Sequence, residues 1–325
     1  MKVLVTGGKG FIGSHLVNYL RAKGHWVRSV DMKKDCFLKT NENSFVQEDL
    51  RTPEVADYVV KDVDWVFNLV ANIGGIGFIT SVKADVMRDN VRVNTNILEA
   101  CRKNDVKRLF FSSSVSVYPR GLQLNPEVKP LKECDAFPAY PDSAYGWEKL
   151  FTELMMQAYH EDYGLDIRIA RFHNIYGPYG TYKGGREKAP AALCRKVAET
   201  PNGGTITIWG DGEQTRSFLY IDDAVEAIYK FMQSDYTEPL NIGSDELISI
   251  NELADLIIEV SGKHLMKQHD LSKPQGVRGR NADLHLIEKV LDWKPTISYR
   301  KGLMKTYRWI EMMIGQEVEV KKKKL

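Results

Sequence analysis

The 325-residue sequence has few cysteines and no long apolar run. Its four cysteines (Cys36, Cys101, Cys134 and Cys194) form no C-x-x-C pair and show no spacing typical of zinc ligands, which argues against a disulfide scaffold and a metal site. We expect reduced thiols in a cytoplasmic protein. No stretch reaches the ~18 apolar residues that a membrane helix needs, and too few residues precede the first glycine turn for a signal peptide. A membrane is therefore not expected among the partners.

The chain also lacks a large excess of charge of either sign. Its 45 basic and 43 acidic side chains give a net charge of +2, which becomes −2, 41 basic against 43 acidic, without the four tail lysines, Lys321 to Lys324. A near-neutral body is unsuited to following a nucleic-acid backbone, so we expect no nucleic-acid partner. The tail itself is predicted to be a solvated terminus. With 43% apolar and 27% charged residues, the chain has the composition of a folded globular protein.

The first half of the sequence predicts short strands that alternate with helices. Strands are expected over residues 2–5, 26–31, 44–47, 65–70 and 108–112, and helices over 11–23 and 86–101. Strands that alternate with helices form a parallel sheet through right-handed crossovers, and the nearly continuous apolar strands indicate that helices cover both faces. We expect a Rossmann-like, doubly wound α/β domain over residues 1–172.

After residue 172 the pattern changes. Loops rich in glycine and proline interrupt the chain at 177–180, 184–185 and 201–204, and helical stretches near 222–232 and 250–260 alternate with short strands such as 240–243. Residues 173–325 are expected to form a smaller C-terminal α/β domain that holds the substrate, and some of its segments could return to the large sheet.

Three glycines mark the turn between the first strand and the first helix. Gly7, Gly10 and Gly13 follow a G-x-x-G-x-x-G spacing directly after that strand. In this setting glycine permits a tight turn and a close approach of the backbone to a pyrophosphate, and the positive end of the helix favours its charge. A plain glycine turn is the alternative, but the order of strand, turn and helix favours a dinucleotide site, which Phe11 and Ile12 would also line.

Two acidic residues extend this site. Asp31 ends the second strand, where its carboxylate can accept hydrogen bonds from an adenosine ribose and would repel a 2′-phosphate, so NAD is the expected cofactor rather than NADP. The neighbouring Lys33 and Lys34 weaken this distinction. Asp49 and Leu50, just past the third strand, are placed to meet the adenine; for Asp49 a helix N-cap is an equal alternative.

A tyrosine and a lysine four residues apart provide the candidate catalytic pair. Tyr145 and Lys149 fall on one face of a predicted helix, and a lysine ammonium beside a phenol favours the phenolate, which brings a pKa near ~10 toward working pH. The spacing alone is common. Following the glycine turn, with the serine-rich strand end at Ser114 between them, it resembles the extended short-chain dehydrogenase/reductases. The resemblance implies that Ser114, Tyr145 and Lys149 form a triad against the nicotinamide of NAD.

Four segments of the second half narrow the resemblance. Residues 171–178, 183–190, 214–218 and 276–281 are similar to those of the GDP-mannose 3,5-epimerases, and the likeness runs over nearly the whole chain. It implies a nucleotide-sugar substrate linked to GDP, oxidation at C4 by NAD, proton exchange at C3 and C5 of the 4-keto sugar, and return of the hydride. The substrate-binding residues that it implies are Gly74, Ser114, Ser116, Asn174, Glu187, Lys188, Ala189, Lys196, Gln214, Thr215, Arg216 and Arg280.

The implied proton-transfer pair departs from the family pattern. Lys188 is implied as one acid–base group, but the cysteine that the family carries two residues after the triad serine is Ser116 here. A thiol with a pKa near ~8.5 exchanges protons at neutral pH far more readily than an unassisted hydroxyl does. Asn72, where the family is expected to carry an aspartate, is a second departure.

Ser116 keeps a second enzymatic hypothesis open. A small hydroxyl residue at this position resembles the 4-epimerases, so the chain could be a 4-epimerase or a 4-dehydrogenase of a GDP-linked hexose or heptose. A 4,6-dehydratase is disfavoured because no carboxylate stands at 115 or 116. A non-enzymatic dinucleotide sensor is disfavoured because the tyrosine–lysine pair is retained. The superfamily also implies a homodimer through the helices that hold 86–101 and 145–160.

Overall fold

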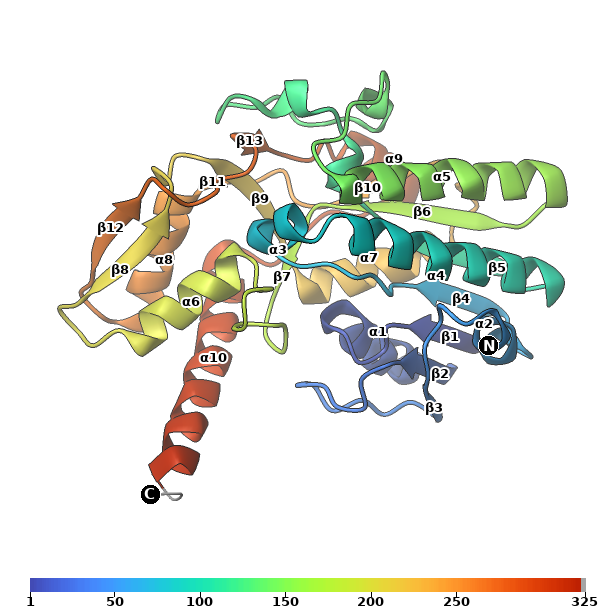
Figure 1. Ribbon diagram of the computed structural model, residues 1–325, viewed down its shortest axis with the longest axis horizontal. Helices are drawn as coiled ribbons and strands as arrows, with labels where there is room; N and C mark the ends of the chain where they lie inside the picture. The colour runs from blue at the N-terminus through green and yellow to red at the C-terminus, as the bar shows by residue number, and fades with distance from the viewer. Residues whose placement is uncertain (323–325) are drawn as a thin grey trace.

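The structure, a computed structural model, describes residues 1–322 and the side chains of residues 1–319 (Figure 1). Its largest element is a seven-stranded sheet with the order β10-β6-β5-β4-β1-β2-β3, in which every neighbouring pair is parallel. The strands are β1 (Lys2–Thr6), β2 (Trp26–Asp31), β3 (Ser44–Gln47), β4 (Trp65–Asn68), β5 (Arg108–Ser114), β6 (Ile167–Phe172) and β10 (Leu240–Ile242). The chain builds outward from β1 in two directions, so the carboxyl ends of β1, β2 and β4 border the crevice where such sheets bind ligands.

Helices cover both faces of this sheet. One face carries α2 (Pro53–Val60), α4 (Ala84–Lys103) and α5 (Ala144–Tyr163), and the other carries α1 (Phe11–Ala22) and α7 (Ile221–Gln233). Successive residues of β1 show the two-sided burial, because Val3 and Val5 belong to the core with α1 and α7, whereas Leu4 belongs to the core with α2, α4 and α5. The predicted doubly wound α/β class and its two covered faces are confirmed.

The rest of the chain forms two smaller sheets and a helical layer. β7, β11 and β13 pair with β9 in a four-stranded sheet, and β12 pairs with β8. The strands are β7 (Asn174–Tyr176), β8 (Thr205–Trp209), β9 (Thr215–Tyr220), β11 (Leu247–Ser249), β12 (Met266–Asp270) and β13 (Gly279–Arg280). The helices α6 (Ala189–Glu199), α8 (Ile250–Ser261) and α10 (Tyr299–Lys322) pack against one another, and the short α3 (Ile76–Ser81) and α9 (His285–Leu291) complete the fold. The end of α10 projects from the body in Figure 1.

One apolar core joins the two halves of the chain. Two elements that follow residue 173 belong to the first half's architecture: β10 is a strand of the large sheet, and α7 packs on it. Their side chains share a buried cluster with α1, α6, α8 and α10. Leu240 of β10, Leu16 of α1 and Leu303 of α10 are all fully buried in this cluster. Segments of the second half therefore do return to the large sheet.

Two strand ends differ from the sequence prediction. The strand predicted to run to residue 70 ends at Asn68, because the N–H groups of Leu69 and Val70 donate to the Thr6 hydroxyl (3.0 and 3.2 Å) rather than to a neighbouring strand. The strand predicted over 108–112 continues, paired with β6, as far as Ser114. Three short 3-10 helices that were not predicted follow it: η1 (Val115–Val117), η2 (Arg120–Gln123) and η3 (Glu133–Ala136).

The remaining observations concern membrane-spanning helices, metal sites, the cysteines and the lysine tail. Within residues 1–322 no helix is long and apolar enough to cross a membrane, and no group of three or more metal-ligating side chains in that part is arranged to hold an ion. The four cysteines are free thiols, of which Cys101 and Cys194 are buried. Of the tail lysines, only the backbone of Lys321 and Lys322 is described, so the prediction of a solvated terminus lies outside the described residues.

Candidate active site

The glycine turn after β1 shapes the N-terminus of α1. Gly7 has a left-handed conformation (φ +68°), and its N–H donates to a β2 carbonyl at 2.8 Å. A Cβ on Gly13 would lie 2.0 Å from the Gly7 carbonyl oxygen, so only glycine lets α1 start this close to β1. Gly10 caps the helix without a side-chain hydrogen bond, and no acidic residue stands in the first turn, which includes Phe11 and Ile12. The free N–H groups there fit an anion such as a dinucleotide pyrophosphate.

Asp31 lies beside that turn, at the carboxyl end of β2. Its Oδ2 accepts the N–H of Lys9 at 3.0 Å, and its Oδ1 accepts the N–H of Lys33 at 2.9 Å. These bonds hold the carboxylate at the edge of the glycine turn, which suits an acceptor for ribose hydroxyls. The structure thus brings Asp31 together with the predicted pyrophosphate site.

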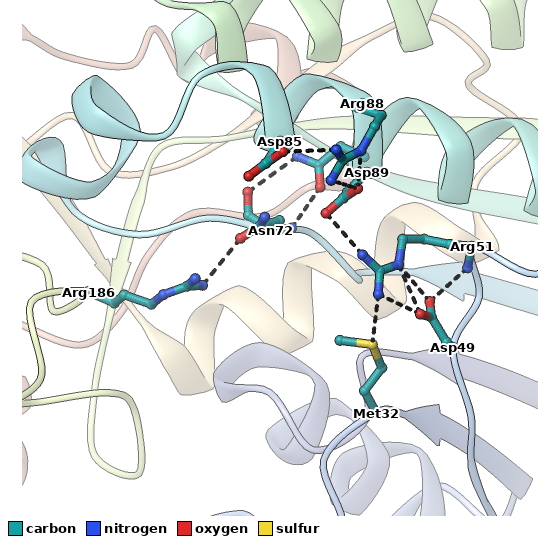
Figure 2. Close-up of polar contacts among 9 residues, drawn as sticks. Met32, Asp49, Arg51, Asn72, Asp85, Arg88, Asp89 and Arg186 are labelled. Atoms are coloured by element: carbon teal, nitrogen blue, oxygen red, sulfur yellow. Dashed lines mark hydrogen bonds and ion pairs between the residues drawn. The ribbon is translucent and has the colours of Figure 1, made fainter.

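Asp49 is engaged with an arginine. Figure 2 shows its carboxylate paired with the guanidinium of Arg51 (2.6 Å to Nη2), which also reaches Asp89 of α4 at 3.1 Å. This pairing lowers the pKa of Asp49. The alternative role as a helix N-cap is wrong, because Thr52 holds that position at the start of α2. Leu50 is buried in the core with α2 and α4, and a contact of Asp49 and Leu50 with adenine stays a prediction.

Ser114, Tyr145 and Lys149, called here the catalytic trio, come together where β5 meets the start of α5. The Ser143 hydroxyl caps α5 by accepting the N–H of Gly146 at 3.2 Å, which fixes Tyr145 in the first turn and Lys149 one turn later. Burial raises the pKa of the Tyr145 phenol, and the neighbouring Ser114 side chain lowers it in part. The three side chains predicted to form the triad therefore lie close together.

Ser116 lies two residues beyond the strand end, in η1. It is buried, and its N–H donates to the Ser114 hydroxyl at 3.1 Å. A Cβ on Gly146 would lie 2.2 Å from the Ser116 carbonyl oxygen, so glycine is what allows α5 to approach η1. The structure thus places Ser116 against the first turn of α5, beside Tyr145.

The lysine ammonium is buried and has no hydrogen-bond partner among the described residues. Lys149 Nζ lies 4.5 Å from the centre of the Phe111 ring and 5.6 Å from that of Tyr145. Its nearest carboxylate oxygen, on Glu148, is 4.0 Å away. Buried donors normally have a partner, and an unpaired one beside a phenol fits a hydroxyl-bearing ligand such as the ribose of a nicotinamide nucleotide.

The electrostatics of the pair differ from the sequence prediction. Burial lowers the pKa of the Lys149 ammonium, and Glu148 partly raises it again. Burial raises the pKa of Tyr145, Glu148 raises it further, and the neighbouring Ser114 lowers it in part. The prediction that the lysine brings the phenol toward neutral pH is wrong for the protein's own groups, because desolvation of the phenolate dominates.

A polar chain that the sequence analysis missed leads away from Glu148. This fully buried carboxylate accepts a hydrogen bond from Asn90 of α4 at 2.8 Å. Asn90 accepts the N–H of Asn72 at 2.6 Å, and Asn72 accepts a bond from Arg186 at 3.3 Å, which Figure 2 shows. Asn72 therefore links α4, and through Asn90 also α5, to the loop before Lys188. An acidic residue directly before the lysine of the trio is the sequence signal that could have revealed it.

A glycine pair after β4 meets the loop before α6. The N–H of Gly75 donates to the Arg186 carbonyl at 3.1 Å, and a Cβ on Gly75 would lie 2.6 Å from the Glu187 carbonyl oxygen. Gly74 is similarly tight, because a Cβ there would lie 2.8 Å from the side chain of Phe78. Close backbone packing thus brings Gly74 and Glu187, both predicted substrate residues, to the same place.

Lys188 and Ala189 follow directly. Ala189 begins α6, and Lys188 is its N-cap. Lys188 is accessible to solvent. Desolvation and, after it, the charge of Arg280 lower the pKa of Lys188. A lysine with a lowered pKa is a usable acid–base group nearer to neutral pH.

Lys188 belongs to a cluster of cations with Arg216 and Arg280. Arg280 is buried, and its guanidinium donates to Gln123 at 2.5 Å and to Asp142 at 3.2 Å. Burial and then the charge of Arg280 lower the pKa of Arg216 to about 9. Within residues 1–319, Asp142 is the only carboxylate in an ion pair with any of the three. The cluster therefore favours an anionic ligand. Sequence reasoning missed Gln123 and Asp142, which no spacing connects to Arg280.

The remaining predicted substrate residues donate to backbone carbonyl groups. Asn174 donates to Ser217 (3.1 Å), Gln214 to Trp209 (3.1 Å), Thr215 to Pro126, and Lys196 to Thr207 (2.6 Å). Lys196 Nζ also lies 5.7 Å from the centre of the exposed Trp209 ring. In Figure 1, α6 and β8, which carry these two residues, lie across β9 from α5. Within residues 1–319, the side chain of Lys196 therefore contacts β8 rather than the catalytic trio.

Comparisons with known proteins agree with this geometry. Residues 3–243 match the family described as NAD dependent epimerase/dehydratase. The chain is 46% identical over 321 residues to GDP-mannose 3,5-epimerase of Arabidopsis thaliana, which covers 98% of this chain and 84% of that protein. It is also 46% identical to GDP-mannose 3,5-epimerase 1 of Oryza sativa subsp. japonica, over 98% of this chain and 83% of that protein.

Solved structures extend the likeness to the fold. UDP-glucose 4-epimerase of Thermotoga maritima with UDP-glucose has a TM-score of 0.86 at 28% identity, and covers 97% of this chain and 100% of that one. UDP-glucuronic acid 4-epimerase of Bacillus cereus, in complex with UDP-glucuronic acid and NAD, has a TM-score of 0.81 at 28% identity. The match covers 96% of this chain and 100% of that one.

His173, next to the site residue Asn174, should make the stability of the fold depend on pH. The ring is buried, its Nε2 lies 3.2 Å from the Asn241 amide oxygen, and burial lowers its pKa to about 3. Between pH ~6.5 and 3 the unfolded chain therefore binds a proton that the folded chain does not. We expect the free energy of unfolding to fall by about 1.4 kcal/mol per pH unit as pH drops through this window.

Denaturant unfolding at a series of pH values measures this slope. His173→Gln should flatten it by about the contribution of one titrating group, and the exposed His264→Gln is the matched control. Equal slopes for the wild type and His173→Gln would contradict the prediction.

Proposed function

The chain belongs to the NAD dependent epimerase/dehydratase family, and from this premise we propose that it is a nucleotide-sugar epimerase of the GDP-mannose 3,5-epimerase type. It is an enzyme, and NAD is its cofactor. The proposed reaction passes through a transient 4-keto sugar and leaves the cofactor unchanged overall. The observation that carries the proposal is the arrangement of a buried tyrosine–lysine pair, Tyr145 and Lys149, on a helix tied by hydrogen bonds to the loop of Lys188.

The catalytic trio supports the oxidation step. The glycine turn, Asp31 and Lys149 are the groups that would hold NAD, which when bound supplies a hydride acceptor for C4 and a positive charge near the phenol. Tyr145 is proposed to take the proton of the C4 hydroxyl, and the neighbouring Ser114 to orient the same oxygen. Because the protein's own groups raise the pKa of Tyr145, the phenolate depends on positive charge beside it.

Lys188 and Ser116 are the proposed groups for proton exchange. A ketone at C4 acidifies the C–H bonds at C3 and C5, so a base of moderate strength is enough to remove these protons. Lys188 is accessible to solvent and has a lowered pKa. Ser116 is buried beside Tyr145 but offers a hydroxyl instead of the thiol of the family, and a hydroxyl is the weaker acid. We therefore assign the larger share of proton exchange to Lys188.

The cation cluster supports a nucleoside diphosphate as the part of the substrate that is bound but not transformed. Arg216, Arg280 and Lys188 are held together although their charges repel, which a diphosphate would relieve. The Lys196–Trp209 pair, across β9 from the catalytic trio, offers an aromatic face and a cation for the base end. The identity of that base as guanine rests on the names of the relatives.

Ser116 favours a second candidate. Without the thiol, exchange at C3 and C5 could be slow enough for the 4-keto sugar to be reduced on its opposite face, which inverts C4 alone. A 4-epimerase or a 4-dehydrogenase of a GDP-linked hexose or heptose is therefore the alternative, and solved structures named as 4-epimerases have the same fold.

A homodimer is proposed from an exposed apolar stripe on α5. Trp147, Phe151 and Leu154 are 43%, 51% and 48% exposed and recur at the spacing of one helix face. α4 packs beside α5 and adds the partly exposed Met87. A second copy of this chain, packed about a two-fold axis, would cover both stripes at once in a four-helix bundle.

The roles of the two parts of the chain and its cellular location belong to the same proposal. Residues 1–172 are proposed as the NAD-binding unit and residues 173–325 as mainly the substrate-binding unit, because the glycine turn lies in the first and the arginines of the cation cluster in the second. The four free thiols are in keeping with a cytoplasmic location.

Incubation with GDP-mannose in D₂O tests the reaction. We expect deuterium at both C3 and C5 of the recovered sugar, with new epimers visible by NMR, because each proton removed from the 4-keto sugar is replaced from solvent. Lys188→Met should slow this exchange by about 10²-fold or more. Deuterium at neither carbon would contradict the proposal for this substrate, and inversion at C4 alone would favour the second candidate.

Replacement of Tyr145 by phenylalanine tests the base. The variant should lose about 10²–10⁴-fold in kcat, because the proton of the C4 hydroxyl then has no acceptor. The amount of NAD that co-purifies, measured by chromatography after denaturation, should not change. Tyr140→Phe, at a tyrosine that is 68% exposed, is the matched control. Undiminished turnover by Tyr145→Phe would refute the assignment.

Light scattering tests the dimer. The wild type should have twice the chain mass of 37.0 kDa, and Trp147→Glu should shift the mass toward a single chain because it places a charge in the apolar stripe. Tyr58→Glu, on the exposed face of α2, should leave the mass at that of the wild type. A wild type of single-chain mass would contradict the proposed assembly.

A further inference from the structure

A buried ion pair lies directly behind the carboxylate proposed to hold the adenosine ribose. The backbone N–H of Lys9 donates to Asp31 at 3.0 Å. The Lys9 ammonium turns away from Asp31 and contacts Glu42 at 2.5 Å and the Thr40 hydroxyl at 2.6 Å. The side chains of Lys9 and Glu42 are only 10% and 7% exposed. A cation thus stands next to the ribose acceptor, held by a second carboxylate.

Further contacts fix this pair in place. The Glu42 carboxylate also accepts the Ser29 hydroxyl at 3.3 Å, and the Lys9 ammonium lies 4.4 Å from the centre of the Phe45 ring. Burial alone raises the pKa of Glu42, but hydrogen bonds from Lys9 and Thr40 more than offset it, and the pKa is lowered. The carboxylate is therefore ionised and the pair is a true ion pair at neutral pH.

The charges of Asp31, Lys9 and Glu42 act on one small region. The thiol of Cys36, in the loop between β2 and β3, is influenced by all three, because Lys9 lowers its pKa whereas Glu42 and Asp31 raise it. Two carboxylates and one ammonium leave this region with one net negative charge. A 2′-phosphate bound here would be repelled by that charge, and the ammonium of Lys9 is already paired with Glu42.

We propose that Glu42 is a specificity-determining residue that makes the chain choose NAD over NADP by holding the Lys9 ammonium. The inference rests on the proposed placement of the adenosine ribose at Asp31. A lysine ammonium is a good phosphate partner when it is free, and a like charge opposite a ligand is an effective means of rejecting it. Glu42 provides both effects, since it occupies the cation and adds a negative charge.

The surface lysines do not reverse this choice. Lys33 and Lys34 are exposed, where water and salt screen their charges. The buried ammonium of Lys9 is screened much less, so its partner decides the local balance. In this proposal the lysine that decides between NAD and NADP is Lys9, paired with Glu42, rather than the exposed Lys33 and Lys34.

The test compares the affinities of the full-length chain for NAD⁺ and NADP⁺. Glu42→Gln keeps the shape of the side chain and removes its charge, so it should tighten NADP⁺ relative to NAD⁺ by about tenfold or more. Calorimetry on protein stripped of nucleotide gives both dissociation constants. Dialysis against equal concentrations of NAD⁺ and NADP⁺, followed by chromatography of the bound nucleotide, gives the ratio independently of activity.

Three further variants isolate the mechanism. Thr40→Val removes the other partner of the ammonium without a change in charge, and should leave the ratio of the two affinities at the wild-type value. Lys9→Gln alone, with the Glu42 carboxylate retained, should weaken NADP⁺ relative to NAD⁺. The double variant Lys9→Gln/Glu42→Gln should lose the gain of Glu42→Gln, because the cation that would contact the phosphate is absent.

The outcomes separate this inference from the proposed function. An unchanged ratio in Glu42→Gln, or a gain that persists in the double variant, would overturn the inference. If the Lys9–Glu42 pair only holds its loop against the glycine turn, Glu42→Gln should lower the melting temperature and leave the ratio of the NADP⁺ and NAD⁺ affinities unchanged. That result would also overturn the inference. Failure of the wild type to bind NAD⁺ would instead overturn the proposed cofactor site.

Discussion

Desolvation at the first two turns of α5 is the constraint on which the site depends. The phenol of Tyr145 and the ammonium of Lys149 are both buried there, and burial disfavours the charged form of each. In a medium of low effective dielectric, a charge placed beside them acts far more strongly than it would in water. In the proposed reaction, proton removal from a sugar by Tyr145 would thereby be coupled to the presence of a positively charged, oxidised nicotinamide.

The substrate side of the molecule shows the opposite pattern. The charge of Arg280 acts against the charged forms of both Lys188 and Arg216, and Asp142 forms an ion pair with Arg280. Holding like charges close together lowers the free energy of unfolding, and an anion that binds between them raises it again. The near-neutral composition conceals this arrangement, because a net charge is a sum over the chain, whereas a binding site depends on the local distribution.

The features that the sequence predicted correctly are local ones. The spacing of Gly7 to Gly13 predicted a turn, and the interval of four residues placed Tyr145 and Lys149 on one face of a helix, because both follow from the geometry of a short segment. Contacts such as Gln123–Arg280, 157 residues apart, carry no such periodicity. The sign of the shift in the pKa of Tyr145 was missed for a related reason, since burial arises only from tertiary packing. The substrate contacts of Asn174, Gln214 and Thr215 stay predictions.

The shared core between the halves of the chain limits how a ligand can enter. Opening the molecule like a hinge would pull fully buried side chains such as Leu240 and Phe231 out of one cluster, at a cost of about 25 cal/mol for each Å² of apolar surface exposed. The segment of Gly75 and the loop of Arg186, joined by a few hydrogen bonds, can part at far lower cost. In the proposed enzyme, admission and departure of a sugar nucleotide would therefore involve these two loops rather than a hinge between the halves of the chain.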